Sequence, residues 1–366
     1  MKKIIIYMSR LKHGGMEKSL IDFLNMSNIS EKNDVCLYLG YTMDKNLIEL
    51  IPKNIKIKLL AKKWNVLGKI IAGIKLTLLK IKYTIVKDAY DISICYTNHQ
   101  KIFSDLARLS SKNSILFVHS DVSRYSSSEM EKMKKKIKYD KFKTIICNSN
   151  KSKNALQSKY EKKLNIKVIP NYIDGENIIK KSNEKITEDI FDKKTITFIN
   201  IANHVEEFKN ISLIINTSAK LKNDYNFKVL LIGSGKDTDY YKELIKEFKL
   251  EDYIFILGTK SNPYPYLKNS DCLLFTSKYE GYGLVLNEAR VLGVPIITSN
   301  CGASEEIVTK EYGDIFYKDS EFEKLMINFI NNPDKNKTIF DYKEFNKKIT
   351  NEFKKIIEKD EFYEKK

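Results

Sequence analysis

Short apolar runs alternate with segments of helical spacing along the first half of the chain. The runs predict strands at residues 4–8, 35–41, 55–60, 92–96, 114–119, 144–148 and 167–169. Helical patterns, such as the one at residues 17–26, separate most of them. Strands that alternate with helices are typical of a doubly wound, parallel α/β sheet. We therefore expect one such domain over residues 1–180.

The same alternation resumes after residues 171–194, a polar segment without an apolar period that predicts a linker. Strands are expected at residues 195–200, 227–232, 253–257, 271–275 and 295–299, and helices at residues 212–223, 239–248 and 284–292. They predict a second α/β domain over residues 190–340. The charged helix expected at residues 341–366 has no sheet of its own, so we expect it to pack back toward the first domain. Two Rossmann-like domains of this kind face a central cleft, the usual place for a ligand.

Composition narrows the class of protein. With 42% hydrophobic and 30% charged residues, the chain is expected to be globular, neither disordered nor a multi-span membrane protein. The five cysteines are scattered and form no Cys-x-x-Cys pair, so neither a zinc knuckle nor a disulfide framework is expected. Reduced thiols fit a cytoplasmic protein.

Positive charge is concentrated in the first half of the chain. Residues 1–180 carry 35 Lys and Arg against 16 Asp and Glu, whereas residues 181–366 carry 29 against 31. This imbalance favours an anionic partner, such as phospholipid, nucleic acid or a phosphorylated substrate. Arginines are few and no nucleic-acid-binding module is recognised, so nucleic acid is not expected as a partner.

Two basic runs account for much of this charge. Residues 50–87 hold ten lysines and no acidic residue, and apolar residues recur there at helical spacing after Trp64. Such a helix is typical of a protein that binds a membrane surface, but it fits equally well a core helix with a solvated lysine face. Residues 132–143 hold seven more lysines. A lipid-diphosphate acceptor at an anionic membrane surface would explain both runs.

The most specific chemistry lies in the stretch Thr276-Ser-Lys-Tyr-Glu-Gly-Tyr-Gly-Leu-Val-Leu-Asn-Glu-Ala-Arg290. It follows an expected buried strand, passes through a Gly-x-Gly loop and enters a helix. A glycine loop at a helix N-terminus presents backbone amides to an anion such as phosphate. Glu280 precedes the loop and Glu288 lies eight positions later, inside the helix. Carboxylates at these places can bind the hydroxyls of a sugar and of ribose.

This Glu-x7-Glu pattern resembles the signature of retaining glycosyltransferases of the GT-B fold, of the family-4 kind that builds cell-surface polysaccharides. Other segments follow the order of motifs in that family: Gly14-Gly-Met-Glu-Lys-Ser19, Cys147-Asn-Ser149, Ile169-Pro-Asn-Tyr-Ile-Asp174, Leu231-Ile-Gly-Ser-Gly235, Phe255-Ile-Leu-Gly258, Gly293-Val-Pro295 and Cys301-Gly-Ala-Ser-Glu-Glu306. The resemblance implies transfer of a hexose from a nucleotide-diphosphate sugar, with UDP-sugar favoured. The implied acceptor is a membrane-linked or surface glycan.

The resemblance also implies roles for individual residues. Glu280 would hold hydroxyls of the transferred sugar, and Glu288 would bind the ribose. Lys209 would neutralise charge on the leaving diphosphate, so that no metal and no separate cofactor is implied. His119, at the end of an expected strand, would complete the catalytic group with Glu280 and Lys209. The remaining donor-binding positions implied are Gly14, Gly15, His204, Gly233, Gly258, Gly281, Tyr282, Gly283, Leu284 and Val285.

One residue departs from the family pattern. The family usually has an arginine five positions before the lysine, where this chain has His204. A neutral imidazole binds phosphate less well than a bidentate guanidinium. Either His204, protonated or neutral, donates a hydrogen bond to the phosphate, or Lys260 supplies the second cation. His13 is a weaker phosphate candidate, and Asp121 fits a helix N-cap as well as a catalytic carboxylate.

The departure leaves other functions open. A catalytically inactive relative that serves as an accessory, glycan-binding partner is the main alternative, and a sugar-nucleotide epimerase is a weaker one. For the enzyme, we expect a cytoplasmic protein, peripheral at the inner face of the cell membrane, where its acceptor and its basic half would meet anionic lipid.

Overall fold

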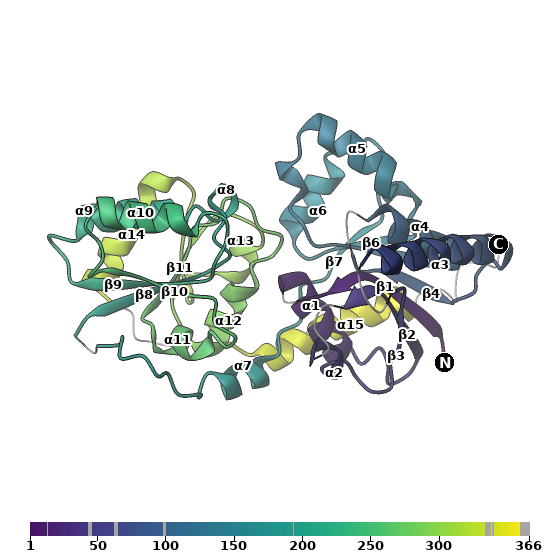
Figure 1. The fold of residues 1–366 in the computed structure, drawn as a ribbon, viewed down its shortest axis with the longest axis horizontal. Coiled ribbons are helices and arrows are strands. Elements are labelled where there is room, and N and C mark those ends of the chain that lie inside the picture. Colours follow the sequence, from purple (N-terminus) through teal and green to yellow (C-terminus); the bar gives the residue numbers. More distant parts are fainter. Residues whose placement is uncertain are drawn as a thin grey trace. The chain divides into compact units, whose positions relative to one another are not determined.

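The computed structural model describes residues 1–12, 14–42, 46–61, 65–97, 100–192, 194–333, 338 and 340–358. The chain divides into two compact units, each with its own sheet and core. Unit 1 holds Met1–Tyr172 and Glu344–Lys366, and unit 2 holds Ile173–Lys343. In each unit helices cover both faces of a parallel sheet (Figure 1).

The sheet of unit 1 has seven parallel strands in the order β3-β2-β1-β4-β5-β6-β7. They are β1 (Lys3–Leu11), β2 (Asp34–Thr42), β3 (Lys56–Leu59), β4 (Ile92–Cys95), β5 (Ser114–Val118), β6 (Thr144–Cys147) and β7 (Ile166–Val168). The order of the strands reverses between β1 and β4, which pair directly. In open α/β sheets, such a reversal is where ligands bind, outside the carboxyl ends of the strands.

The core of unit 1 has two layers, one on each face of this sheet. Successive residues of β1 alternate between them: Ile4 and Ile6 belong to the layer that contains Leu20, and Ile5 and Tyr7 to the layer that contains Leu106. The helices are α1 (Gly15–Met26), α2 (Asn46–Glu49), α3 (Val66–Ile85), α4 (Lys101–Ser110), α5 (Ser127–Ile137) and α6 (Asn150–Gln157). Short 3₁₀ turns lie at Val122–Arg124 and Tyr139–Lys141.

The C-terminal helix α15 (Tyr342–Glu358) packs into the core of unit 1. The ring of Phe353 is fully buried and meets Phe23 of α1 edge to face, with centroids 5.0 Å apart. Thr350 Oγ1 donates to the carbonyl of Met26 at 3.4 Å, and Lys2 Nζ donates to the carbonyl of Ile357 at 2.6 Å. The helix thus covers a sheet whose strands lie entirely within the first 170 residues.

The sheet of unit 2 has six parallel strands in the order β10-β9-β8-β11-β12-β13, so here the order reverses between β8 and β11. The strands are β8 (Ile196–Ile201), β9 (Phe227–Ile232), β10 (Ile254–Gly258), β11 (Cys272–Phe275), β12 (Ile296–Ser299) and β13 (Gly313–Phe316). The helices are α7 (Gly175–Lys181), α8 (Glu206–Lys209), α9 (Ile211–Leu221), α10 (Thr238–Glu247), α11 (Tyr264–Asn269), α12 (Leu284–Leu292), α13 (Ser304–Ile307) and α14 (Asp319–Asn331).

The polar segment at residues 171–194 is more ordered than the linker we expected. Asp174 accepts a hydrogen bond from the amide of Asn177 and so caps α7, a helix that the sequence pattern did not predict. Ile178 of this helix is fully buried, and α7 packs against α11 and α12 of unit 2. The prediction failed because one buried isoleucine is too little for a recognisable period.

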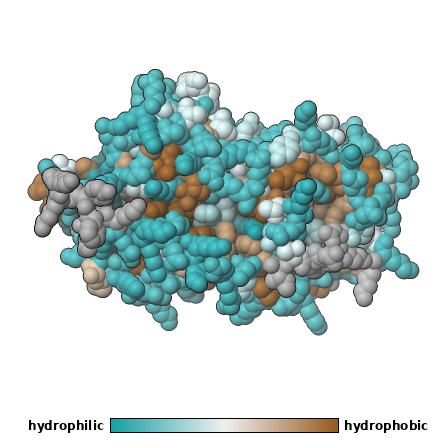
Figure 2. Space-filling model, turned by 180° about the vertical axis from the view of Figure 1, so that it is seen from behind, coloured by the Kyte–Doolittle hydropathy of each residue, from teal (hydrophilic) through white to brown (hydrophobic). Residues whose placement is uncertain are grey.

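Among the described residues, no helix is both long enough and apolar enough to cross a bilayer. Seen from behind, the surface is mostly hydrophilic, and hydrophobic side chains gather in separate patches (Figure 2). All five cysteines are buried and none forms a disulfide.

Candidate functional site

The carboxyl edge of the sheet in unit 2 carries most of the predicted donor-binding residues. Lys209 lies in the segment after β8, Gly233 directly follows β9, Gly258 ends β10, and residues 276–283 follow β11. Because the strands are parallel, these segments share one edge of the sheet. β8 and β11 are neighbours at the reversal of strand order, which is the expected ligand position in such sheets.

Two of the predicted catalytic residues meet at this reversal. The ammonium of Lys209, the last residue of α8, forms an ion pair with the carboxylate of Glu280 in the loop after β11. The backbones beside them are also joined: Thr276 Oγ1 donates to the carbonyl of Lys209 at 2.9 Å, and the amide of Lys278 donates to the carbonyl of Phe208 at 2.8 Å. Both charged side chains remain about one fifth exposed, so a ligand can reach them.

A glycine turn leads from Glu280 into α12. Gly283 is the N-cap of this helix and has φ +90°, a conformation that strongly favours glycine. Gly302, after β12, packs across the turn: a Cβ there would lie 3.0 Å from the Cβ of Glu280. The amide of Ala303 donates to the carbonyl of Tyr282 at 3.3 Å. The loop after β12 thus holds a helix N-terminus whose dipole suits an anion.

The side chain of Tyr282 belongs to the core and not to an open site. Its hydroxyl accepts a hydrogen bond from Asn287 Nδ2 at 3.2 Å, and Arg290 Nη1 donates to Asn287 Oδ1 at 2.9 Å. The guanidinium of Arg290 lies over the ring of Phe340 at 3.6 Å. Burial raises the pKa of the Tyr282 hydroxyl. The side chain of Tyr282 is therefore closed to a ligand, and its predicted role at the donor site would have to come from its backbone.

Glu288 lies on α12 beyond the glycine turn, and only 8% of it is exposed. The hydroxyl of Tyr264, from α11, lies 3.3 Å from its Oε1. A carboxylate that is buried needs hydrogen-bond donors. This one is therefore held by the protein and suited to accept further hydrogen bonds from paired hydroxyls such as those of ribose. The two glutamates of the pattern stand on either side of the turn at Gly283.

His204, predicted at the donor site, is fully buried. Its Nδ1 lies 2.9 Å from Thr238 Oγ1, and that hydroxyl in turn accepts from the amide of Gly235 at 2.9 Å. The backbone of His204 brackets the same loop, because its amide donates to Ser234 and its carbonyl accepts from Asp237. Burial lowers the pKa of the imidazole, which favours the neutral form. The ring therefore supports the loop after β9, and its direct contact with a donor stays a prediction.

Gly233, directly after β9, allows this strand end to come close to the end of β8. Gly233 has φ +141°, and a Cβ there would lie 1.8 Å from the carbonyl oxygen of Ala202. Its amide donates to the carbonyl of Gly258 at 2.9 Å, and Ser234 Oγ lies 2.7 Å from Thr259 Oγ1. Close approach of backbone to backbone is the reason that glycine is needed here.

Lys260 is engaged away from the Lys209–Glu280 pair. Its ammonium forms an ion pair with Glu188, which also accepts a hydrogen bond from the hydroxyl of Tyr266 at 2.7 Å. These two partners lower the pKa of Glu188 to about 2. Glu188 lies in the segment that we expected to be a linker, and no pattern in the sequence marks it as the partner of Lys260.

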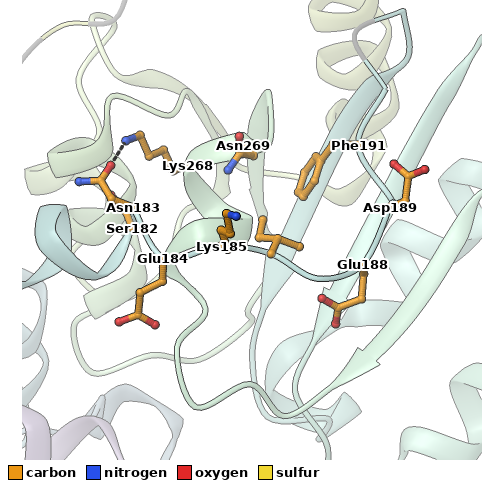
Figure 3. Close-up of a pocket in the computed structure, with 10 residues that line it drawn as sticks. Ser182, Asn183, Glu184, Lys185, Glu188, Asp189, Phe191, Lys268 and Asn269 are labelled. Carbon is orange, nitrogen blue, oxygen red and sulfur yellow. Dashed lines mark hydrogen bonds between the residues drawn. The ribbon is translucent and has the colours of Figure 1, made fainter.

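The same segment lines an open pocket of about 440 Å³ (Figure 3). Its lining residues come from residues 182–191 and from α11, and Lys268 Nζ donates to Asn183 Oδ1 at 2.6 Å. The labelled side chains of Figure 3 point in different directions and do not converge on one position. None of the predicted site residues lines this pocket, and we assign it no ligand.

The predicted glycines of unit 1 follow β1 at its carboxyl end. Gly14 is the N-cap of α1 and Gly15 is its first residue. Gly14 has an extended φ of 172°, and the nearest atom to a Cβ there would be Glu17 Oε2, at 2.6 Å. The carboxylate of Glu17 lies 3.9 Å from Arg10. His13, next to this turn, lies outside the described residues.

His119 follows β5 in unit 1. Its ring lies 4.5 Å from the ring of Tyr96 and stacks on Phe117 at 5.7 Å. Asp121 accepts a hydrogen bond from the amide of Ser123 at 2.8 Å and caps a 3₁₀ turn, which is the simpler of its two predicted roles. The strand order β1-β4-β5 brings the segments of Gly14 and His119 to one edge of the same sheet.

The C-terminal segment matches a known family. Residues 181–345 match the family described as Glycosyl transferases group 1. An uncharacterized glycosyltransferase of Methanocaldococcus jannaschii is 30% identical over 162 residues, which is 43% of this chain and 39% of that protein. The N-acetylgalactosamine-N,N'-diacetylbacillosaminyl-diphospho-undecaprenol 4-alpha-N-acetylgalactosaminyltransferase of Campylobacter jejuni is 33% identical over 156 residues, or 42% and 40% of the two chains. The chain thus matches about two fifths of the length of these curated relatives.

Solved structures of similar fold extend the likeness to both units. Anabaena HepE in complex with UDP and glucose aligns with a TM-score of 0.73 at 18% identity, over 96% of this chain and 99% of that one. WaaG, a glycosyltransferase involved in lipopolysaccharide biosynthesis, aligns with a TM-score of 0.66 at 11% identity, over 97% and 98%. Identities this low show the fold alone. That fold is GT-B, with two Rossmann-like parallel α/β domains, and the predicted fold class is confirmed.

Proposed function

We propose that this protein is a retaining glycosyltransferase. It moves a sugar from a nucleotide-diphosphate sugar, with a UDP-sugar favoured, to a lipid-linked or surface glycan acceptor. The observation that carries the proposal is the pairing of Lys209 with Glu280 at the strand-order reversal of unit 2, next to the N-terminus of α12. The match of residues 181–345 to the glycosyl transferases and the UDP bound to Anabaena HepE support it.

The ion pair between Lys209 and Glu280 suits a site that binds a charged ligand, because each side chain can exchange its partner for the ligand. When a diphosphate binds, the ammonium of Lys209 can turn to its oxygens and stabilise the negative charge that grows as the sugar leaves. Glu280 is then free to accept hydrogen bonds from hydroxyls of the sugar. Because the backbones of residues 208–209 and 276–278 are hydrogen-bonded to each other, the exchange needs only side-chain rotation.

The groups around this pair complete the donor site in the proposal. Backbone amides of residues 281–285 and the dipole of α12 face the phosphates, while Glu288 accepts hydrogen bonds from the ribose hydroxyls. The lysine and the amides supply the positive charge, so the reaction needs no metal. For unit 1, the proposal keeps the roles of Gly14 and Gly15 in donor binding and of His119 in an interaction with the sugar or phosphate of the donor.

The proposed acceptor and cellular location are based on the positive charge of the first half of the chain. A glycan carried on a lipid diphosphate is anionic, and the excess of basic residues in the first half of the chain fits such an acceptor. One relative is named for a diphospho-undecaprenol substrate, and another for capsular polysaccharide biosynthesis. We propose a cytoplasmic enzyme, peripheral at the inner face of the membrane.

Donor binding is tested first, by thermal shift with UDP-, GDP-, ADP- and TDP-sugars. A ligand at one hundred times its Kd stabilises the fold by about 2.7 kcal/mol, and we expect this for one nucleotide class. The change Glu288→Gln removes the charge that binds the ribose, so affinity should fall on the order of 10-fold to 100-fold. Glu247→Gln, on the exposed end of α10, is the matched control and should bind as the wild type does. Equal shifts in both variants would contradict the role of Glu288.

Transfer is tested next, by NMR of the product. The anomeric configuration of the donor sugar should be kept, and chelators should leave the rate unchanged. An inverted product would overturn the retaining mechanism. Nucleotide-sugar binding without transfer to any lipid-linked acceptor would instead favour the accessory, glycan-binding partner. A changed sugar in the absence of acceptor would indicate an epimerase.

A further inference from the structure

Helix α3 exposes a row of apolar side chains that none of the described residues of unit 1 covers. We call it the outer stripe; its members are Leu67, Ile70, Ile71, Ile74, Leu78, Ile81 and Ile85. They recur at intervals of three and four residues and therefore lie on one face of the helix. Each is between 40% and 75% exposed. Among the described residues, they are close to half of all exposed large hydrophobic side chains.

The opposite face of α3 is the one that packs. Gly68, Ala72 and Tyr83 are buried, and Leu76 and Leu79 are partly buried against the core of unit 1. The helix lies beside α4 (Figure 1). The packed face settles the alternative raised by the sequence: the outer stripe does not face the core of unit 1.

An ion pair across the packed face fixes α3 further. Lys80 Nζ lies 2.9 Å from Asp105 of α4, and Asp105 also pairs with Arg108. Partial burial raises the pKa of Asp105, but hydrogen bonds and charge from Lys80 and Lys101 outweigh it, so that the pKa is lowered. The helix is therefore anchored by residues that the outer stripe does not use, and the stripe is available for a partner.

The charges beside the outer stripe are all positive. Lys75 and Lys82 are seven residues apart, so they lie on the same flank of the stripe, and both are exposed. Within the described part of the chain, neither forms an ion pair with an acidic side chain. The sequence from residue 50 to residue 87 contains no acidic residue at all. A partner of the stripe must therefore accept apolar side chains and positive charge together.

We propose that the outer stripe of α3 binds the surface of an anionic lipid bilayer. The helix would lie flat, with the stripe among the upper parts of the acyl chains and Lys75 and Lys82 at the lipid phosphates. The stripe runs over 19 residues, from Leu67 to Ile85, which is about 27 Å along the helix axis. A second copy of the chain is a poorer occupant, because it would bring the lysines of two copies together. The inference rests on the peripheral membrane location in the proposed function and names the helix that makes the contact, but it does not depend on the sugar chemistry of unit 2.

The experiment uses the full chain and vesicles of defined composition. We expect the protein to float with phosphatidylglycerol-containing vesicles and not with pure phosphatidylcholine vesicles. High salt should weaken the binding, because screening acts on the lysines. Binding should persist without any nucleotide sugar, which keeps this test separate from the test of the donor site.

Two variants with matched controls locate the contact. The triple change Ile70→Ser, Ile74→Ser and Leu78→Ser should lower vesicle binding by more than about 10-fold, since each buried apolar side chain contributes to the partition. The control changes Ile179→Ser, Tyr240→Ser and Tyr317→Ser, which are exposed but lie in unit 2. Far-UV circular dichroism and the thermal midpoint check that α3 still folds.

The charge pair is tested in the same way. Lys75→Gln with Lys82→Gln should weaken binding more than Lys132→Gln with Lys135→Gln on α5, although both variants lose two charges. Equal losses would mean that net charge alone attracts the vesicles and would overturn the assignment to α3. Undiminished binding by the Ile70/Ile74/Leu78 variant would overturn it too. So would a wild-type dimer that the same variant converts to a monomer, because a second copy would then cover the stripe.

Discussion

The two units contain the same kind of parallel sheet, but the loops at its carboxyl edge carry different residues. In unit 2 the reversal of strand order carries an ion pair, Lys209 with Glu280. In unit 1 the corresponding edge carries the Gly14 turn and His119, whose ring packs on aromatic neighbours. The shared scaffold determines where a site can form, and the loops determine its chemistry.

The backbone conformations of the glycines also differ between the two units. Among the described residues, every glycine with a positive φ lies in unit 2: Gly233, Gly258, Gly283, Gly293, Gly302 and Gly313. Three of them, at 233, 258 and 283, stand at predicted donor-binding positions. Loops held in such conformations cannot be rebuilt with other residues without strain. The carboxyl edge of unit 2 is thus more constrained than that of unit 1, which fits the nucleotide site proposed there.

The largest effect should come from breaking the ion pair of unit 2. Replacing Lys209 by alanine removes the charge that we propose stabilises the leaving diphosphate, so the transfer rate should fall on the order of 10²-fold to 10³-fold. The thermal midpoint should change little, because the backbone bonds of residues 208–209 to residues 276–278 remain. Lys246→Ala, on the exposed face of α10, is the control. A Lys209→Ala enzyme within a few-fold of the wild-type rate would remove the central element of the proposed mechanism.

A smaller effect, on stability, should separate the glycine turns of the two units. Gly233→Ala places a Cβ against the carbonyl of Ala202 at φ +141°, so the free energy of unfolding should fall by about 1–3 kcal/mol or more. Gly14→Ala meets only the flexible end of Glu17 at an extended φ, so its change should stay within about 1 kcal/mol. Urea denaturation of both variants measures the difference. Equal losses would show that the two turns are equally constrained.

The smallest effect concerns the buried imidazole of unit 2. Burial lowers the pKa of His204 below its ordinary value of 6.5. Between these two values the unfolded chain binds more protons than the folded one, so stability falls as pH falls through 6.5 toward the folded-state value.

The variant His204→Gln cannot titrate and should lack this contribution. The measurement is the slope of the free energy of unfolding against pH, taken for the wild type and for the variant. The difference between the two slopes is at most about 1.4 kcal/mol per pH unit. The loss of stability that the variant shows at every pH does not affect this slope. Identical slopes would mean that the imidazole titrates normally in the folded protein.

The sequence by itself determined the order of the motifs and all strands except β13 (Gly313–Phe316), where no strand was predicted. Parallel strands are buried on both faces, so they appear as continuous apolar runs, and the observed strands lie within a residue or two of most predicted positions. For β1 the observed strand, Lys3–Leu11, extends three residues beyond the run. The Glu280 and Glu288 pattern was also visible, because a strand, a glycine turn and a helix in succession are local features.

Only the tertiary structure decided which residues meet and which face a helix turns outward. Lys209 and Glu280 are far apart in sequence and are joined by the pairing of β8 with β11. The orientation of α3 was open because its packed face also contains apolar residues, and nothing local distinguishes that face from the outer stripe. His204 was expected at a ligand and is enclosed by the loop after β9. A local pattern records what each segment can bury, whereas long-range packing determines what it does bury.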